Sequence, residues 1–296
     1  MDVLVFGAGS LGSLIGGLLA RTHEVTLVGR DPHVRTVVAD GLEIVGEIGT
    51  RVRPSATTDG TDRTADLAIV TVKAYDTEEA IDALSTGRFG AVLSLQNGLT
   101  EERLHAGLDV PIVAGTATYG ARLLEPGRVE CTGVGELVIG PYGGGTDPAV
   151  DAIGEAIAAS GIDVTVAEDM PRRRWEKLAV NVGINPVTAL ARVENGALSE
   201  PPLASIAHAA ALETAAVARR VGVDLPDDVV IDSIETVIEA TARNRSSMLQ
   251  DVEAGRRTEI EAIVGPVVDR ADTHGLDVPV SRTLLGLVRG LETGLQ

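Results

Sequence analysis

A glycine-rich hexapeptide near the first residue constrains the fold of this chain more than any other feature. The apolar, β-prone run 3–6 is followed at once by Gly7-Ala8-Gly9-Ser10-Leu11-Gly12 and then by the helix-compatible stretch 13–21. Strand, glycine turn and helix in this order are typical of a dinucleotide site. The first glycine permits the turn, the second lets the backbone approach a pyrophosphate, and the third lets the helix pack on the strand. We therefore expect all six residues, Gly7, Ala8, Gly9, Ser10, Leu11 and Gly12, to bind a nicotinamide or flavin nucleotide.

The end of the second expected strand indicates which dinucleotide is preferred. The run 24–28 ends in Gly29-Arg30, where an acidic residue would accept a hydrogen bond from the 2′-hydroxyl of an adenosine ribose. An arginine there favours the 2′-phosphate of NADP, with NAD as the alternative cofactor. Arg30 also fits a second interpretation, as an ordinary solvent-exposed loop charge. Asp31 follows it and is placed to cap the next helix.

Further strands follow at βαβ intervals. We expect them at 66–72, 91–95 and 111–114, with a helix over 77–84 between the first two. Active groups of such sheets lie at the carboxyl ends of strands. Lys73 comes directly after one strand and Gln96-Asn97-Gly98 directly after the next, so Lys73 and Asn97 are candidates for the nucleotide site. Asn97-Gly98 is also a common turn pair.

The rest of the first half predicts the completion of one α/β domain, and the second half predicts a helical one. Short apolar runs near 123, 129–131 and 137–139 look antiparallel, and a helix over 148–159 and a strand over 162–166 follow. From residue 168 the β-type runs give way to helical periodicity, interrupted by glycine and proline. The chain is therefore expected to form a Rossmann-type domain over 1–167 and an all-α substrate domain over 168–296.

The first expected helix of the second half carries a row of polar side chains. Lys177, Asn181 and Asn185 recur at i, i+4 and i+8, which places an ammonium and two carboxamides on one face among apolar neighbours. Such a row suits a polar ligand, although a solvated surface stripe is the alternative interpretation. Pro186 disfavours helical geometry at the residue before it, so the helix is expected to kink or break at Asn185.

Lysine is nearly absent from this chain. Of 25 basic residues only Lys73 and Lys177 are lysines, which leaves 23 arginines (25 − 2). A lysine ammonium can give up a proton, whereas a guanidinium stays charged. Both lysines are therefore candidates for a site, although an arginine-rich chain could also retain two lysines by chance.

Composition excludes several classes of function. The net charge of −18 argues against nucleic acid or an anionic membrane as a partner, because both would be repelled. Cys131 is the single cysteine and the five histidines lack ligand spacing, so we expect no disulfide and no metal site, in a reducing cytoplasm. No apolar stretch reaches membrane-spanning length. Strong acidity with few lysines also resembles proteins of a high-salt cytoplasm.

Over nearly its whole length the chain resembles the 2-dehydropantoate 2-reductase, or ketopantoate reductase, family. The resemblance is carried by the glycine motif, Val72-Lys73-Ala74, Gln96-Asn97-Gly98, the stretch 175–186 and the block 244–260. It implies a Rossmann-type domain followed by an all-α domain like the C-terminal domain of 6-phosphogluconate dehydrogenase. The implied reaction is the NADPH-dependent reduction of 2-dehydropantoate to (R)-pantoate, a step toward pantothenate and coenzyme A.

The same resemblance assigns roles to individual residues. The reaction itself needs a proton donor for the developing alkoxide, and we expect this donor to be Lys177. By the resemblance, Glu259 would reach the cofactor and orient Lys177. The substrate would be held by Asn97, Asn181, Asn185, Asn195 and Ser247, and the cofactor also by Lys73, Asn97, Ala121 and Glu259. A paralogous reductase of another 2-oxo acid and a non-catalytic nucleotide sensor are the alternatives. The sequence leaves open whether the protein is a monomer or a homodimer, and whether coenzyme A inhibits it.

Overall fold

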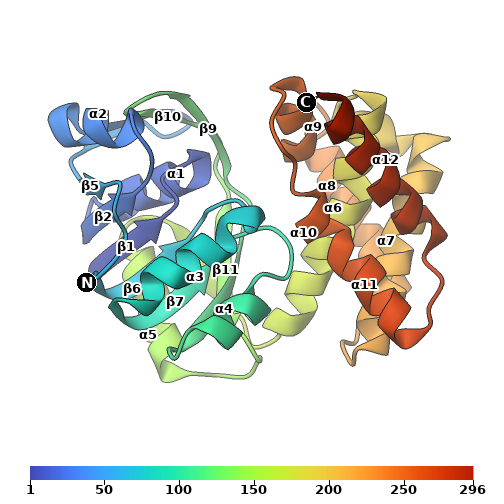
Figure 1. Ribbon diagram of the computed structural model, residues 1–296, viewed down its shortest axis with the longest axis horizontal. Coiled ribbons are helices and arrows are strands. Elements are labelled where there is room, and N and C mark those ends of the chain that lie inside the picture. Colours follow the sequence, from blue (N-terminus) through green and yellow to red (C-terminus); the bar gives the residue numbers. More distant parts are fainter. Residues whose placement is uncertain (296) are drawn as a thin grey trace. The chain divides into compact units, whose positions relative to one another are not determined.

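The computed structural model describes residues 1–295 and divides the chain into two compact units. The first unit comprises Met1–Gln96 and Thr100–Met170. The second comprises the chain from Pro171 onward together with the short segment Asn97–Leu99. No pattern in the sequence indicated that three residues from the middle of the first half belong with the helices. An α/β first half and an all-α second half are confirmed (Figure 1).

A mainly parallel sheet forms the centre of the first unit. Within the described residues it has eight strands in the order β12-β11-β8-β7-β6-β1-β2-β5. Their bounds are β1 (Asp2–Phe6), β2 (Glu24–Val28), β5 (Ser55–Thr57), β6 (Thr64–Val70), β7 (Arg88–Ser94), β8 (Ile112–Ala117), β11 (Glu136–Pro141) and β12 (Asp163–Val166). From β5 to β8 this is the strand order of doubly wound dinucleotide-binding sheets, and the order reverses between β1 and β6. Within the described sheet the one antiparallel pairing is between β8 and β11, and β12 runs parallel to β11.

Helices cover both faces of this sheet because each strand alternates its side chains. In β1, Val3 and Val5 pack with α1 (Ser10–Leu19) and α5 (Pro148–Ala158), whereas Leu4 and Phe6 pack with α3 (Thr77–Ser85) and α4 (Glu101–Gly107). The short 3₁₀ helix η1 (Ala74–Asp76) leads directly into α3. Both sheet faces are therefore buried, which explains why the strands read as continuous apolar runs.

A second, smaller sheet was only half predicted. It has the order β4-β3-β10-β9, with bounds β3 (Leu42–Gly46), β4 (Thr50–Val52), β9 (Gly120–Glu125) and β10 (Arg128–Gly133). The antiparallel pair β9 and β10 was expected, as was a helix after Asp31, which is α2 (His33–Asp40), but β3 and β4 were not. Asp31 does not cap α2, because its carboxylate accepts a hydrogen bond from Arg35 Nε at 2.9 Å instead. The small sheet packs on α1 through residues such as Leu42, Ile44 and Val129.

The second unit is built from helices alone in its described part. They are α6 (Met170–Ala191), η2 (Asn195–Ser199), α7 (Leu203–Arg220), α8 (Asp227–Ala240), α9 (Ser247–Glu253), α10 (Ile260–Ile263), α11 (Gly265–His274) and α12 (Pro279–Leu295). Small residues let α6 and α7 approach closely, because a Cβ on Gly183 would lie 2.8 Å from the carbonyl oxygen of Ala207. No helix in the described residues is long and apolar enough to cross a membrane.

The expected helix break before Pro186 is not present. Instead α6 continues as one helix of 22 residues to Ala191. A proline inside a helix costs about 3 kcal/mol or more. That cost is outweighed here by burial, because Val182, Val187 and Ala189 are all in the core of the unit and each fully buried valine contributes roughly 1.5–3 kcal/mol. Tertiary packing has overridden the local preference.

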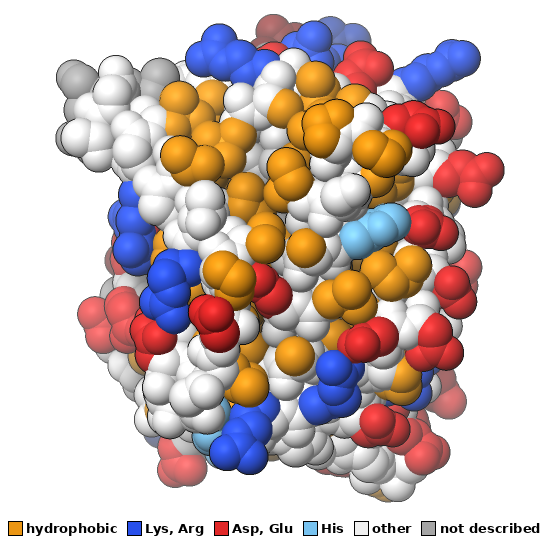
Figure 2. Space-filling view, turned by 90° about the vertical axis from the view of Figure 1, so that its right-hand side faces the viewer, with side chains coloured by type: hydrophobic (Ala, Val, Ile, Leu, Met, Phe, Trp, Pro, Cys, Tyr) orange, Lys and Arg blue, Asp and Glu red, His pale blue; other side chains and the backbone are white. Residues whose placement is uncertain are grey.

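One face of the second unit mixes apolar and charged side chains. Figure 2 shows hydrophobic side chains across the middle of this face and carboxylates mostly toward its margins. Among the large hydrophobic residues of the unit, Ile206 of α7 and Leu287 of α12 are exposed. Most carboxylates on this face therefore lie around the apolar region, and a few lie among its hydrophobic side chains.

A buried histidine joins three parts of the first unit. His33, in α2, accepts a hydrogen bond at Nδ1 from the backbone N–H of Gly127, at 3.0 Å. Because that N–H can only donate, Nδ1 is unprotonated, and the neutral ring donates from Nε2 to Ser13 Oγ of α1, 3.1 Å away. Burial lowers the pKa of His33 from its ordinary value of about 6.5. Protonation of Nδ1 would remove the acceptor of the hydrogen bond from Gly127, so that bond would be lost.

The variant His33→Asn should reveal this titration. Since the native ring resists protonation, the unfolded chain binds more protons below about pH 6.5, and the stabilisation by His33 is lost as the pH falls. An asparagine can accept from Gly127 without titrating. In urea titrations at pH 7.5 we expect the wild-type protein to have a larger free energy of unfolding than the variant. The difference between the two free energies should become smaller toward pH 5.5. His274→Asn, at an exposed position, is the control. A difference in free energy of unfolding between wild type and His33→Asn that grows toward low pH would contradict the neutral state assigned to His33.

Candidate functional site

The glycine turn lies where the strand order of the main sheet reverses. Gly7 has φ +117°, and a Cβ there would lie 2.5 Å from the backbone nitrogen of Val72. A Cβ on Gly12 would overlap the carbonyl oxygen of Gly7. Thr71 Oγ1 donates to the same oxygen at 2.8 Å. Both glycines are therefore required by the packing of the protein itself.

Gly9 is different, because nothing in the protein requires a glycine there. It is exposed, has an extended conformation with φ −82°, and a Cβ would meet no atom closer than 4.0 Å. It also occupies the N-cap position of α1, which has neither a side-chain cap nor an acidic residue in its first turn. The amides of that turn are available for an anion. An open approach at Gly9 beside a helix N-terminus fits the pyrophosphate of a dinucleotide.

Lys73 lies in a loop whose backbone is held on both sides. Gln96 Nε2 donates to the carbonyl oxygen of Val72 at 3.0 Å and to Thr77 Oγ1 at 2.9 Å. Arg103 Nη2 donates to the carbonyl oxygen of Ala74 at 2.6 Å. These contacts fix the path of the chain after β6, next to the glycine turn. The sequence predicted Gln96 only as part of a motif. Its hydrogen bond to the loop could not be predicted, because the acceptor, Val72, lies 24 residues earlier.

Arg30 follows β2 but does not lie alone in solvent. Its Nη2 is 3.0 Å from Asp76 Oδ2 and 3.9 Å from Glu79 Oε2, although the side chain is 79% exposed. The guanidinium is therefore paired with carboxylates, although most of its side chain is exposed. The cation expected to attract an anion already has two carboxylates beside it.

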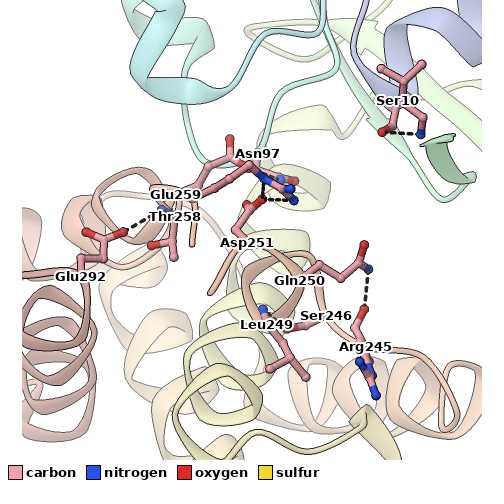
Figure 3. A network of polar contacts seen from close by, with 12 residues as sticks. Ser10, Asn97, Arg245, Ser246, Leu249, Gln250, Asp251, Thr258, Glu259 and Glu292 are labelled. Atoms are coloured by element: carbon pink, nitrogen blue, oxygen red, sulfur yellow. Dashed lines mark hydrogen bonds and ion pairs between the residues drawn. The ribbon is translucent and has the colours of Figure 1, made fainter. Parts of the chain in front are cut away.

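Ala121 and Ser10 lie on facing elements of the first unit. Ala121 is in β9, where it pairs with Cys131 of β10. Ser10 begins α1, and its Oγ accepts a hydrogen bond from the backbone N–H of Leu123 at 3.0 Å (Figure 3). The small sheet is thereby tied to the N-terminus of α1, and Ala121 is two residues from this link.

In the second unit, the segment Asn97–Leu99 is docked on α10. Asn97 Nδ2 donates to Glu259 Oε2 at 3.0 Å (Figure 3), and Glu259 is only 5% exposed. Gly98 has φ +84°, and a Cβ there would overlap the carbonyl oxygen of Ala262. Leu99 is buried in the helical core. Asn97-Gly98 is thus more than a turn pair, because these two residues and Leu99 pack within the helical unit.

The turn before Glu259 is shaped by charged side chains. Glu292 Oε1 accepts from the backbone N–H of Thr258 at 2.6 Å (Figure 3). Arg256 donates to Asp251 Oδ1 from Nε at 3.0 Å and from Nη2 at 2.9 Å. Asp251 is itself buried. These contacts fix the chain just before Glu259 without involving its carboxylate directly.

The polar row of α6 is continuous because the helix does not break. Lys177 and Asn181 are half-buried, and Asn185 is 6% exposed. A stripe that faced solvent along its whole length would not bury Asn185. The row therefore runs from a partly accessible ammonium to an enclosed carboxamide.

The remaining candidates lie on elements that contact one another in the second unit. Asn195 begins η2, is buried, and donates from Nδ2 to Thr241 Oγ1 at 2.9 Å. Its backbone N–H donates to the carbonyl oxygen of Asn244, also at 2.9 Å. Ser247 is the exposed first residue of α9. The neighbouring Ser246 caps α9 by accepting from the N–H of Leu249 at 3.1 Å.

A hydroxyl pair joins α6 to this region. Thr188 Oγ1 donates to Ser246 Oγ at 2.7 Å, one turn after Asn185 and one residue before Ser247. This bond joins α6 to the start of α9, and the bond from Asn195 to Asn244 joins η2 to the segment just before α9. Thr188 and Ser246 were missed from the sequence. A serine followed by a helical run is a recognisable capping signal, but the partner on another helix is not readable from sequence.

The chain matches two family models that together span most of its length. One, described as ketopantoate reductase PanE/ApbA, matches residues 3–144, and its C-terminal companion matches residues 169–292. The chain is 46% identical over 299 aligned residues to the 2-dehydropantoate 2-reductase of Halobacterium salinarum, which covers 98% of each chain. A PanE/ApbA family ketopantoate reductase from Ralstonia eutropha JMP134 has a similar structure, with a TM-score of 0.92, 34% identity and 100% of each chain covered.

The fold is also shared with an enzyme of another name. A D-mandelate dehydrogenase solved with NADH and anilino(oxo)acetate superposes with a TM-score of 0.93, covering 100% of this chain and 99% of that one. The identity is 24%, so this similarity concerns the fold alone.

Replacing Gly9 by alanine should separate binding from folding. Because a Cβ at Gly9 meets no protein atom, stability in urea should stay within about 0.5 kcal/mol of wild type. The methyl group would occupy the space that a pyrophosphate needs, so we expect at least about tenfold weaker NADPH binding in a fluorescence titration. Gly49→Ala, also in open space, is the control for binding. Gly12→Ala should instead destabilise the fold, and unchanged NADPH affinity in Gly9→Ala would argue against a dinucleotide here.

Proposed function

Because the chain belongs to the ketopantoate reductase family, we propose that it reduces 2-dehydropantoate to (R)-pantoate with NADPH. The observation that carries the proposal is the continuous polar row of α6. It holds Lys177, the only lysine of the helical unit, on the same helix face as Asn181 and Asn185. An ammonium and two carboxamides match a substrate that has a ketone beside a carboxylate. The product would serve the synthesis of pantothenate and coenzyme A in the cytoplasm.

Each group of the row has a chemical task in this proposal. The ammonium of Lys177 donates a hydrogen bond to the ketone oxygen, which polarises the carbonyl, and then gives its proton to the alkoxide oxygen. The carboxamides of Asn181 and Asn185 donate hydrogen bonds to the substrate's carboxylate and hydroxyl. The reduced nicotinamide, when bound, supplies the hydride.

Asn195, Ser247, Asn97 and Glu259 complete the proposed arrangement. Asn195 and Ser247 lie on elements joined to α6 and would bind the polar end of the substrate. Asn97 is oriented by its hydrogen bond to Glu259, so one of its amide hydrogens is already committed and its oxygen can accept from a ligand. The buried Glu259 carboxylate would counter the positive charge of Lys177 and contact the cofactor.

The cofactor would bind to the first unit. The N-terminal amides of α1 and the open approach at Gly9 would hold the pyrophosphate. Lys73, from the braced loop, and Ala121, near the start of α1, would line the nucleotide. Arg30 would contact the 2′-phosphate that distinguishes NADPH from NADH.

A substrate panel tests the proposed reaction. NADPH oxidation is followed by absorbance with ketopantoate and with a series of 2-oxo acids, in parallel with NADH and at several salt concentrations. We expect the highest kcat/KM for ketopantoate with NADPH. Preference for another acid, such as an aryl 2-oxo acid, would assign a paralogous reductase, and nucleotide binding without any turnover would indicate a sensor. Rates that rise with salt would support adaptation of this acidic chain to high ionic strength.

Lys177→Ala should reduce kcat by roughly 10²–10⁴, the range for general acid–base groups, because the alkoxide loses its proton donor. NADPH affinity, measured by fluorescence, should be nearly unchanged because the proposed nucleotide contacts of the first unit remain. Lys177→Arg is the matched control, since it retains charge but not a labile proton. We expect it to remain more than about tenfold slower than wild type. An arginine variant with normal turnover would exclude Lys177 as the proton donor.

A further inference from the structure

Asp76 holds an unusual position for a residue at the start of a helix. It directly precedes α3, where an aspartate ordinarily accepts a hydrogen bond from the first turn of the helix. Its side chain makes no such bond. The carboxylate is instead directed at Arg30, with 3.0 Å between Oδ2 and Nη2, and its side chain is 24% exposed. The carboxylate therefore forms an ion pair with Arg30 and does not cap α3.

The position of Asp76 is fixed by the loop that carries Lys73. The backbone N–H of Asp76 donates to the carbonyl oxygen of Lys73 at 2.8 Å, which closes the turn of η1. Gln96 and Arg103 hold the same loop. Asp76 is therefore presented to Arg30 by a braced segment, whereas Arg30 is on a long, exposed side chain. In this pair the carboxylate is the fixed partner and the guanidinium is the movable one.

The local charge around Arg30 opposes an anion. Asp76 and Glu79 place two negative charges within 4.0 Å of one positive charge, so the group as a whole is negative. A phosphate binds arginine best through two parallel hydrogen bonds from the guanidinium fork. To offer its fork to a 2′-phosphate, Arg30 must give up part of its contact with Asp76. The next arginine along the chain, Arg35, is itself engaged with Asp31 at 2.9 Å.

We propose that Asp76 is a specificity-determining residue that competes with the 2′-phosphate of NADPH for Arg30. The inference rests on the proposed function in one respect, namely that Arg30 is the contact for the 2′-phosphate. Asp76 lowers the affinity for NADPH and leaves the affinity for NADH nearly unchanged, because NADH has no group that needs the arginine. The preference for NADPH is therefore weaker than Arg30 alone would give.

The expected size follows from the exposure of the pair. Exposed ion pairs are weak and are screened by salt. We therefore expect Asp76→Asn to tighten NADPH binding about two- to fivefold at low ionic strength, with the gain shrinking as salt rises. Glu79 is farther from Arg30, so Glu79→Gln should act in the same direction with a smaller effect.

The test measures binding rather than turnover. Dissociation constants for NADPH and NADH, and for 2′,5′-ADP and 5′-AMP as probes of the adenosine end, are measured by fluorescence and calorimetry. Glu78→Gln is the matched control, because it makes the same change of charge on α3 but removes a partner of Arg103, 3.5 Å away, and not of Arg30. Arg30→Ala is the second arm. Urea titrations establish that each variant is folded.

The outcomes separate the inference from the proposed function. Tighter binding of NADPH and 2′,5′-ADP in Asp76→Asn, with NADH, 5′-AMP and the Glu78→Gln control unchanged, supports competition. Unchanged or weaker NADPH binding overturns it, and weaker binding would mean that Asp76 orients Arg30 for the phosphate instead. If Arg30→Ala weakens NADPH and NADH equally, the 2′-phosphate contact itself is wrong and the inference falls with it. Ketopantoate turnover in the wild-type protein is judged independently by the substrate panel.

Discussion

The close approach of two backbone segments at Gly7 organises the first unit. The turn after β1 and the chain after β6 come so near that a Cβ on Gly7 would touch the backbone of Val72, and Thr71 bonds the carbonyl oxygen of Gly7. This contact sets where α1 begins and where the loop with Lys73 and Asp76 runs. Any larger residue would separate the two segments. The proposed nucleotide site is therefore a consequence of glycine packing that the sheet needs in order to form.

In the helical unit the corresponding constraint is the burial of α6. The helix runs through Pro186 because its second half is enclosed by apolar neighbours, and the lost backbone hydrogen bond is a smaller term than that burial. If the helix ended before Asn185, that side chain would no longer lie on the same helix face as Lys177 and Asn181. The polar row would then be one residue shorter. The polar residues thus depend for their alignment on the hydrophobic side chains between them.

Local patterns predicted the parts of the fold that are stabilised locally. The strand, glycine turn and helix at the start were recognisable because their chemistry lies within about twenty residues, and the limits of β2 were correct for the same reason. The pairing of β3 with β10 was missed because β10 lies more than eighty residues later, and the short local hairpin of β3 with β4 was missed as well. The docking of Asn97 on Glu259 and the pairing of Arg30 with Asp76 were missed because sequence shows a residue's type but not which distant charge it meets.

A chain with a net charge of −18 must attract an anionic cofactor through local features, and these differ in what they can recognise. In the proposed site, the amides at the start of α1 would bind the pyrophosphate of NADPH and of NADH equally, since every pyridine dinucleotide carries one. We propose that discrimination between NADPH and NADH lies at the end of β2, where the guanidinium of Arg30 meets the carboxylate of Asp76 from another loop. That ion pair is on the surface and supports no part of the core. One substitution can therefore change the charge near Arg30 without altering the fold. In the proposed site, affinity and specificity for the nucleotide would therefore depend on physically separate groups. Affinity would depend on backbone amides that the fold holds in place, and specificity on surface side chains that can be substituted without altering the fold.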